Sequence, residues 1–229
     1  MSDADYFKGE QSREEFRAEM LANIPRWYSP WAHLAGTLGV GLGASALAVL
    51  SIHALRPLEL LAIPVMFVLS NIAEWHAHRN LLHRRYKPIA ALYDRHTPEH
   101  HRVYRYHSME ISETKELRLV LIPAVGVLTI VLAAAPPALL AGWLLGPNVG
   151  WLVLLTAALY VVGYELSHLA YHLPEESFIG QRKLVRVMRE HHARHHDPRL
   201  MQRYNFNVTV PLGDLLFGTM APAKLNRPA

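Results

Sequence analysis

Long apolar stretches, separated by polar segments, dominate the pattern of this chain. From Trp31 to Leu55, and again from Leu119 to Tyr164, the sequence contains no Asp, Glu, Lys or Arg. About 20 apolar residues are enough for a helix to cross the hydrocarbon core of a bilayer. Uncharged runs of this length therefore predict membrane-spanning helices.

The apolar runs divide into four predicted spans that form two hairpins. The predicted spans are residues 31–55, 58–75, 119–146 and 151–166. Arg56-Pro57 is the turn of the first hairpin and Gly146-Pro147-Asn148 that of the second, with Pro136-Pro137 an alternative end for the third span. The fold class predicted is all-α, an integral membrane protein with about four transmembrane helices. The alternative is a soluble bundle of very apolar helices.

Residues 1–229 are predicted to form one membrane domain. Its parts are an N-terminal interfacial segment (1–30), a first membrane hairpin (31–75), a histidine-containing segment (76–118), a second hairpin (119–172) and a C-terminal histidine-containing segment (173–229). Within the first part we expect a short amphipathic helix on the membrane surface. Its apolar side would carry Phe7, Phe16 and Leu21.

The basic residues predict the orientation of the spans. Of the 23 Lys and Arg residues, only Arg56 lies in a loop on the far side; all others precede the first span, follow the second or follow the fourth. Basic residues mark the cytoplasmic side of a membrane protein. Both termini and all histidine groups are therefore predicted to be cytoplasmic. A positive rim against anionic headgroups accounts for the net charge of +4, so no nucleic-acid partner is expected.

Histidine is the residue type that indicates chemistry here. Of 15 histidines, only His33 and His53 lie away from the polar segments and the span ends beside them, and these two are treated as ordinary residues. The other histidines include four groups: His78 and His83; His96, His100 and His101; His168 and His172; His192, His195 and His196. The chain has no cysteine, which excludes thiolate ligands and iron–sulfur clusters.

Helical spacing predicts which histidines point the same way. Residues three or four apart share a helix face, so same-face sets are predicted for His168 with His172, for His96 with His100, and for His192 with His195 and His196. His78 and His83 are five apart and would diverge by roughly 140° on a regular helix. They could share a site if the helix ended between them or if a second metal lay to one side.

Ten imidazoles at one membrane face favour a metal centre. Unliganded, they would be costly to bury together, and their number exceeds what one ion accepts, so two ions are predicted. A nitrogen-rich site favours redox-active iron over structural zinc, which needs only four ligands. Zinc could replace iron in overexpressed protein. His76, His107 and His191 are not expected to be ligands.

Acidic and amide side chains near the four histidine groups are candidates for orienting the imidazoles. Glu74 and Glu165 each lie one helical turn from a proposed ligand, where a carboxylate can accept the second N–H of a ligating imidazole. The alternative is that both carboxylates reach the headgroups. Four further candidates are Asp197, Asp214, Asn205 and Asn207, and loop capping is the alternative role of the two asparagines.

The order and spacing of these boxes resemble the membrane-bound fatty acid hydroxylase/sterol desaturase superfamily of histidine-box di-iron proteins. The matching motifs are H-R-N-L-L-H (78–83), H-T-P-E-H-H (96–101), H-L-A-Y-H (168–172), H-A-R-H-H (192–196) and the closing YNFNVTVPLGDLLFGT (204–219). The resemblance covers roughly residues 60–219. The second box is one residue longer than is usual in the lipid hydroxylases, Asn207 replaces a common glycine, and Gly213 replaces an aromatic residue.

The resemblance implies a cytoplasmic helical cap that holds two iron ions over the ends of the spans. It further implies an oxidoreductase that uses O2 and external electrons to hydroxylate an alkyl C–H bond of a membrane lipid. The sequence contains no cytochrome b5 domain, so a separate donor is expected, either cytochrome b5-like or a ferredoxin with its reductase.

Three other functions compete with hydroxylation. A desaturase could use the same centre and remove a second hydrogen. A non-enzymatic bis-His haem protein would need only two to four histidines placed within the spans. A metal transporter would place polar ligands near mid-bilayer, whereas the centres of the spans have none.

The predicted topology can be tested with reporters. A reporter inserted near Asn148 and one fused after Ala229 should lie on opposite sides of the membrane, because four spans place the second hairpin turn and the C-terminus on different faces. Protease protection of each reporter in sealed vesicles is the measurement. If both reporters lie on the same side of the membrane, the histidine groups cannot all lie at one membrane face.

Overall fold

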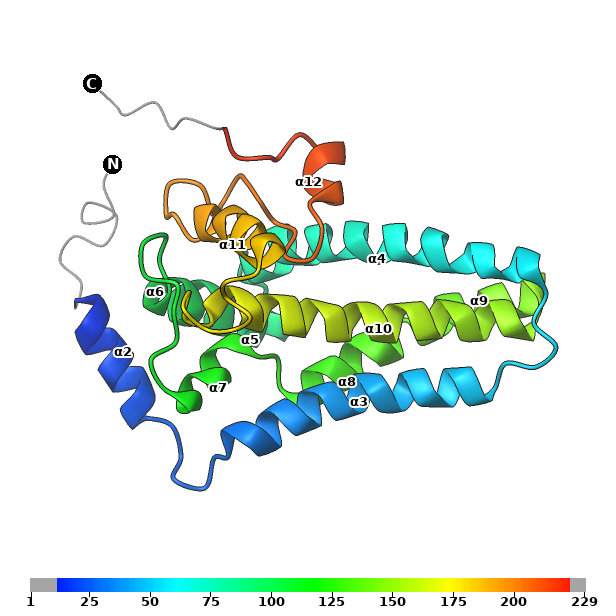
Figure 1. The fold of residues 1–229 in the computed structure, drawn as a ribbon, viewed down its shortest axis with the longest axis horizontal. Helices are drawn as coiled ribbons and strands as arrows, with labels where there is room; N and C mark the ends of the chain where they lie inside the picture. Colours follow the sequence, from blue (N-terminus) through cyan, green and yellow to red (C-terminus); the bar gives the residue numbers. More distant parts are fainter. Residues whose placement is uncertain (1–11, 223–229) are drawn as a thin grey trace.

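The computed structural model describes residues 12–222 (Figure 1). Within these residues the secondary structure is helical with no strands, which confirms the predicted all-α class. The α-helices are α2 (Arg13–Ala22), α3 (Pro30–Leu50), α4 (Ala62–Ala77), α5 (Ala90–Asp94), α6 (His101–Val103), α7 (Leu117–Val120), α8 (Ala124–Ala133), α9 (Ala135–Leu145), α10 (Pro147–His172), α11 (Lys183–His195) and α12 (Leu212–Leu216). Short 3₁₀ turns precede α4, α5 and α7, and π turns follow α4 and α5.

Four helical stretches are long and apolar enough to cross a membrane. They are Pro30–Leu50, Pro57–Leu82, Thr114–Leu145 and Pro147–His172. α10 is the central helix, since 56% of its most apolar segment is buried inside the protein, against 22–28% for the corresponding segments of the other three stretches. Figure 1 shows α3, α4, α9 and α10 running side by side along the long axis of the molecule. The outer surfaces of the other helices remain apolar and exposed, as a bilayer requires.

The boundaries of the first and fourth spans differ from the predicted ones. The first ends earlier, at Leu50, and the fourth continues past Leu166 to His172. The third ends at Leu145, close to the predicted end, and so continues through the alternative end at Pro136-Pro137. These prolines occupy the first turn of α9, where a missing backbone N–H breaks no helical hydrogen bond.

A polar clasp closes the end of the bundle that carries the two hairpin turns. Glu59 accepts hydrogen bonds from the Arg56 guanidinium at 2.8 Å and from Asn148 Nδ2 at 3.0 Å. The Asn148 amide also pairs with the backbone of His53, in both directions. His53 therefore belongs to the turn structure, as expected for an ordinary residue.

The short helices gather at the opposite end of the bundle (Figure 1). There α2 begins with a capping box, in which the Ser12 hydroxyl accepts from Glu15 N and Glu15 accepts from Ser12 N. The prediction that the apolar side of this helix faces the membrane surface is wrong for Phe16. That side chain is buried against Val103 and Tyr104, because the protein's own core offers it apolar neighbours. Phe7 lies outside the described residues.

A close helix contact in the second hairpin depends on glycine. At Gly150 of α10, an added Cβ atom would lie 2.6 Å from the Ala138 carbonyl oxygen and 3.0 Å from Gly142 Cα, both backbone atoms of α9. Backbone atoms cannot rotate away as the end of a side chain can. Small residues at this crossing let the two helices approach closely, which is how helices pack well in a membrane.

We therefore expect Gly150→Ala to destabilise the protein by about 1–3 kcal/mol, the usual cost of overpacking. Gly163→Ala is the matched control on the same helix, because no atom lies within 4 Å of the position that its methyl group would take. Thermal unfolding in detergent would compare the two variants. Equal midpoints for both would show that the α9–α10 contact relaxes without cost.

Candidate metal centre

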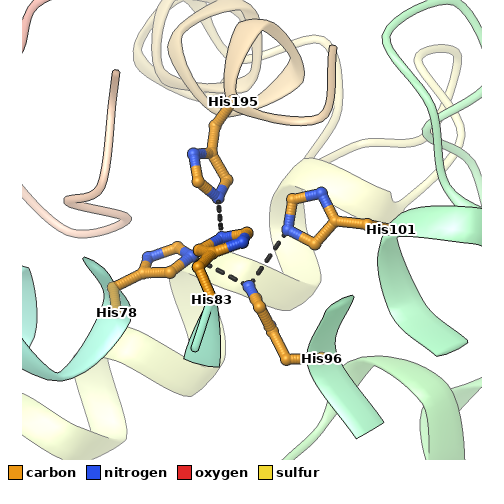
Figure 2. Close-up of side chains that lie close together, drawn as sticks. All are labelled: His78, His83, His96, His101 and His195. Carbon is orange, nitrogen blue, oxygen red and sulfur yellow. Dashed lines mark hydrogen bonds between the residues drawn. The ribbon is translucent and has the colours of Figure 1, made fainter. Parts of the chain in front are cut away.

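Ten buried histidines form two clusters at the end of the bundle away from the hairpin turns. Group one consists of His78, His83, His96, His101 and His195, and group two of His100, His168, His172, His192 and His196. Within each group, one ring nitrogen per residue lies within 4.8 Å of the others, so each group could hold a metal ion. Figure 2 shows group one, whose rings converge from separate segments of the chain.

Two π turns explain how histidines five residues apart come together. The backbone is π-helical over His78–Leu82 and again over Arg95–His100. A π turn closes its hydrogen bond at i+5, as between His101 N and His96 O, so residues five apart stack on one face. The rings of His78 and His83 are stacked 5.3 Å apart. The two residues can therefore share a site although the helix does not end between them, and no second metal to one side is needed.

The π turns also correct the predicted pairing in the second box. His96 shares group one with His101, while His100 belongs to group two. Pro98 lies inside the π turn and does not begin a helix there. His96 is therefore placed among the other candidate ligands despite the longer box.

The last box divides in the same way. His192 and His196, four apart, remain together in group two, but His195 turns to group one and does not project with them as predicted. Neighbouring residues on a helix point about 100° apart, so the His100-His101 and His195-His196 dipeptides each supply one ring to each group. The stacked rings of His101 and His196, 4.1 Å apart, mark the boundary between the groups.

The distances between ring nitrogens match those of ligands on a shared ion. In group one, the Nε2–Nε2 distance is 2.8 Å for His83 and His195, 2.9 Å for His78 and His96, and 3.0 Å for His96 and His101. In group two, His192 and His196 are 3.1 Å apart, and His100 and His168 are 3.2 Å apart. Two nitrogens ~2.1 Å from one ion and at right angles to each other lie ~3.0 Å apart.

Protein acceptors fix the tautomer of six of these rings. Nδ1–H donates to a backbone carbonyl from His78 (Phe206), His100 (Leu119), His172 (Met109), His195 (Tyr204) and His196 (Tyr104). His83 Nδ1–H donates to Thr97 Oγ1, whose own proton goes to the Leu82 carbonyl. A neutral imidazole protonated at Nδ1 presents a bare lone pair at Nε2.

A cation between the rings would stabilise these tautomers. His83 and His195 both present bare Nε2 atoms, which face each other at 2.8 Å and would repel. His172 Nε2 is buried and has no hydrogen-bond partner. Orienting Nδ1–H through a carbonyl is how proteins hold metal-binding imidazoles. The residues present therefore fit two metal ions.

Burial keeps the imidazoles neutral. It lowers the pKa of each ring in the short-helix region well below the ordinary value, and neighbouring rings lower it further: His83, His96, His100, His101, His192, His195 and His196. Protons therefore do not compete with a metal ion for these nitrogens near neutral pH.

The two carboxylates predicted to support the imidazoles bind other groups instead. Glu74 accepts hydrogen bonds from Tyr160 Oη, from Thr209 Oγ1 at 2.6 Å, and from the backbone N–H groups of Val208 and Thr209. Glu165 Oε2 accepts from Ile122 N at 2.9 Å, where the third span is interrupted. Both carboxylates accept hydrogen bonds from backbone N–H groups outside regular helices. Such groups need a partner within the protein, because the hydrocarbon region of a membrane contains no water.

Three of the remaining supporting candidates, Asp214, Asn205 and Asn207, lie in the C-terminal strap, residues 204–219. Asp214 accepts from the backbone N–H groups of Phe206 and Asn207 and from Thr219 Oγ1. Burial alone would raise the pKa of Asp214, but these bonds and the one from His191 lower it. The strap carbonyls of Tyr204 and Phe206 are thereby held against His195 and His78.

Asparagines and a salt bridge complete this frame. Asn207 bridges Asp214 N and the Asn71 carbonyl, and Asn205 Nδ2 donates to the His191 carbonyl. Asp197 pairs with Arg199 at 2.5 Å and contacts no imidazole. Trp75 occupies the space where a larger residue than Gly213 would stand, since a Cβ there would lie 2.8 Å from Trp75 Cβ.

The other five histidines lie outside both groups. His53, His76 and His107 are exposed, His33 pairs with Tyr28, and His191 contacts Asp214 at 3.2 Å. The acceptors that orient the rings were not found from the sequence, since a backbone carbonyl leaves no residue-type signal. Only Thr97, inside the second box, offered a side chain that could have been noticed.

The comparisons with known proteins agree with this arrangement. The family model described as fatty acid hydroxylase matches residues 63–219. Among solved structures, the chain is similar to one described as full-length scs7p with only the hydroxylase domain visible, with a TM-score of 0.59 and 15% identity over 95% of this chain and 82% of that one. At this identity the likeness shows the fold. The comparison with curated proteins found no match.

The geometry predicts that gently purified protein binds about two metal ions per chain and that His96→Ala binds about one. His96 Nε2 lies beside Nε2 of both His78 and His101, so its loss opens group one and leaves group two. His53→Ala, at the far end, is the control and should retain both ions. Metal analysis by mass spectrometry is the measurement. Full metal content in His96→Ala would reduce the ligand set to nine.

Proposed function

Since the chain belongs to the fatty acid hydroxylase family, we propose that it is a membrane-bound di-iron monooxygenase that hydroxylates an alkyl C–H bond of a membrane lipid. Supporting this are two buried five-histidine groups at one end of four apolar helices. Two adjacent ions held only by neutral nitrogen ligands suit redox chemistry, whereas a structural zinc site needs four ligands.

Bound iron would supply the activation of O2, with one oxygen atom inserted into the C–H bond and the other released as water after the addition of two electrons and two protons. The protein's own residues hold and shield this chemistry. Carbonyls on the strap and on residues 104–119 keep the Nε2 lone pairs directed inward. All ten rings are buried, which excludes water from the reacting centre. No separate general base is assigned.

The electron donor is proposed to be a separate protein, cytochrome b5-like or a ferredoxin with its reductase. The lipid substrate would enter from the bilayer, because the site lies at the ends of apolar helices whose outer surfaces are exposed. We further propose that both termini and the histidine groups face the cytoplasm, in line with the distribution of basic residues.

Lipid mass spectrometry of expressing cells tests the reaction. Cells with the wild-type chain should contain a lipid species heavier by one oxygen, and cells with His192→Ala should lack it, because His192 Nε2 lies 3.1 Å from His196 Nε2 in group two. His33→Ala is the matched histidine control and should retain the product. A species lighter by two hydrogens would instead identify a desaturase. No change in the lipids, or a haem absorption band in the purified protein, would contradict the proposal.

A further inference from the structure

Different parts of the chain orient the two histidine groups. In group two, the carbonyls that accept Nδ1–H belong to Tyr104, Met109 and Leu119. In group one, the carbonyl acceptors Tyr204 and Phe206 belong to the C-terminal strap. No strap carbonyl contacts group two among these hydrogen bonds. The metal sites therefore have separate supports.

The N-terminal helix α2 braces the support of group two. Arg17 donates to both oxygens of Glu116, at 2.7 and 2.5 Å, and also to the Glu110 carbonyl at 3.1 Å. Arg13 Nε donates to the Val103 carbonyl at 2.7 Å. Phe16, between these arginines, is buried in the same cluster as Val103 and Tyr104. α2 lies outside residues 63–219, the segment that the family model matches.

Tyr104 transmits this contact to the histidines. Its hydroxyl donates to Glu116 Oε2 at 2.9 Å, and its carbonyl accepts from His196 Nδ1 at 2.7 Å. Its ring packs against His172, with the centroids 4.5 Å apart, and against His100 at 5.1 Å. The residue is fully buried, so it has little room to take another position. Every histidine that it touches belongs to group two.

We propose that α2 positions the metal ligands of group two through the relay Arg17–Glu116–Tyr104, so that metal can be lost from group two while group one keeps its own. The inference rests on the proposed dimetal centre. The Glu116 carboxylate is fully buried, with Arg17 as its charged partner. Removing that partner leaves a buried charge held only by neutral donors, namely Ser112, the Glu113 N–H and Tyr104. The carboxylate and Tyr104 would then shift, and the carbonyl that orients His196 with them.

Metal stoichiometry of point variants tests the relay. Arg17→Ala should bind about half the metal of the wild type, and Arg17→Lys, which keeps a cation near Glu116, should recover much of the loss. Glu19→Gln, an exposed change on the same helix, should bind as much metal as the wild type. Helical content and the unfolding midpoint, measured on each protein, separate a folded variant from one that has lost its structure.

Combined variants identify which ion is lost. In a His172→Ala background, where group two is already open, Arg17→Ala should remove no further metal. In a His78→Ala background it should remove the remaining ion. Wild-type metal content in folded Arg17→Ala, or equal loss in both backgrounds, would overturn the relay. A wild-type protein that binds no metal would instead overturn the dimetal centre itself, together with the inference that rests on it.

Discussion

The structure around the site depends on one constraint: ten neutral imidazoles are buried with their ring nitrogens facing one another. An acceptor behind a ring stabilises its Nδ1 proton, and a cation in front of the rings would offset the repulsion between their bare lone pairs. Peptide carbonyls at loop and helix-end positions, together with Thr97, provide acceptors for six rings. The non-helical segments after the second and fourth spans therefore have a purpose, because carbonyls inside a regular helix are already paired.

The same non-helical segments contain backbone N–H groups that have no partner within a helix. The carboxylates of Glu74 and Glu165 accept hydrogen bonds from several of them. Glu74 binds the strap at Val208 and Thr209, and Glu165 binds Ile122 N at the break in the third span. At the same break, Thr37 Oγ1 donates a hydrogen bond to the Ile122 carbonyl at 2.7 Å. Charged and hydroxyl groups at membrane depth thus complete the backbone hydrogen bonds that ligand orientation has interrupted. Glu74 and Glu165 therefore contact backbone groups, whereas their sequence positions had suggested contacts with the imidazoles.

The parts of this architecture that the sequence predicted are those that depend on residue type. Uncharged runs predicted four helices, and the excess of histidine predicted the ten rings of the two groups. The grouping was mispredicted for His96, His100 and His195, because the choice between α and π geometry depends on tertiary contacts and not on local propensity. The role of Glu74 was also mispredicted. Its proximity to His78 along α4 was evident, but the strap that it binds lies more than 130 residues away in the chain.

The spacing of paired histidines follows the number of residues per turn of the helix on which they lie. Both pairs of group two, His168 with His172 and His192 with His196, are four apart on α-helical backbone, whereas both pairs of group one are five apart on π turns. The rings converge in either case, because each spacing is close to one turn of its own helix. The length of a histidine box can therefore change by one residue without moving its imidazoles, provided that the number of residues per turn changes with it. The convergence of the rings is in this sense tolerant of a one-residue insertion or deletion, because the backbone takes up the difference.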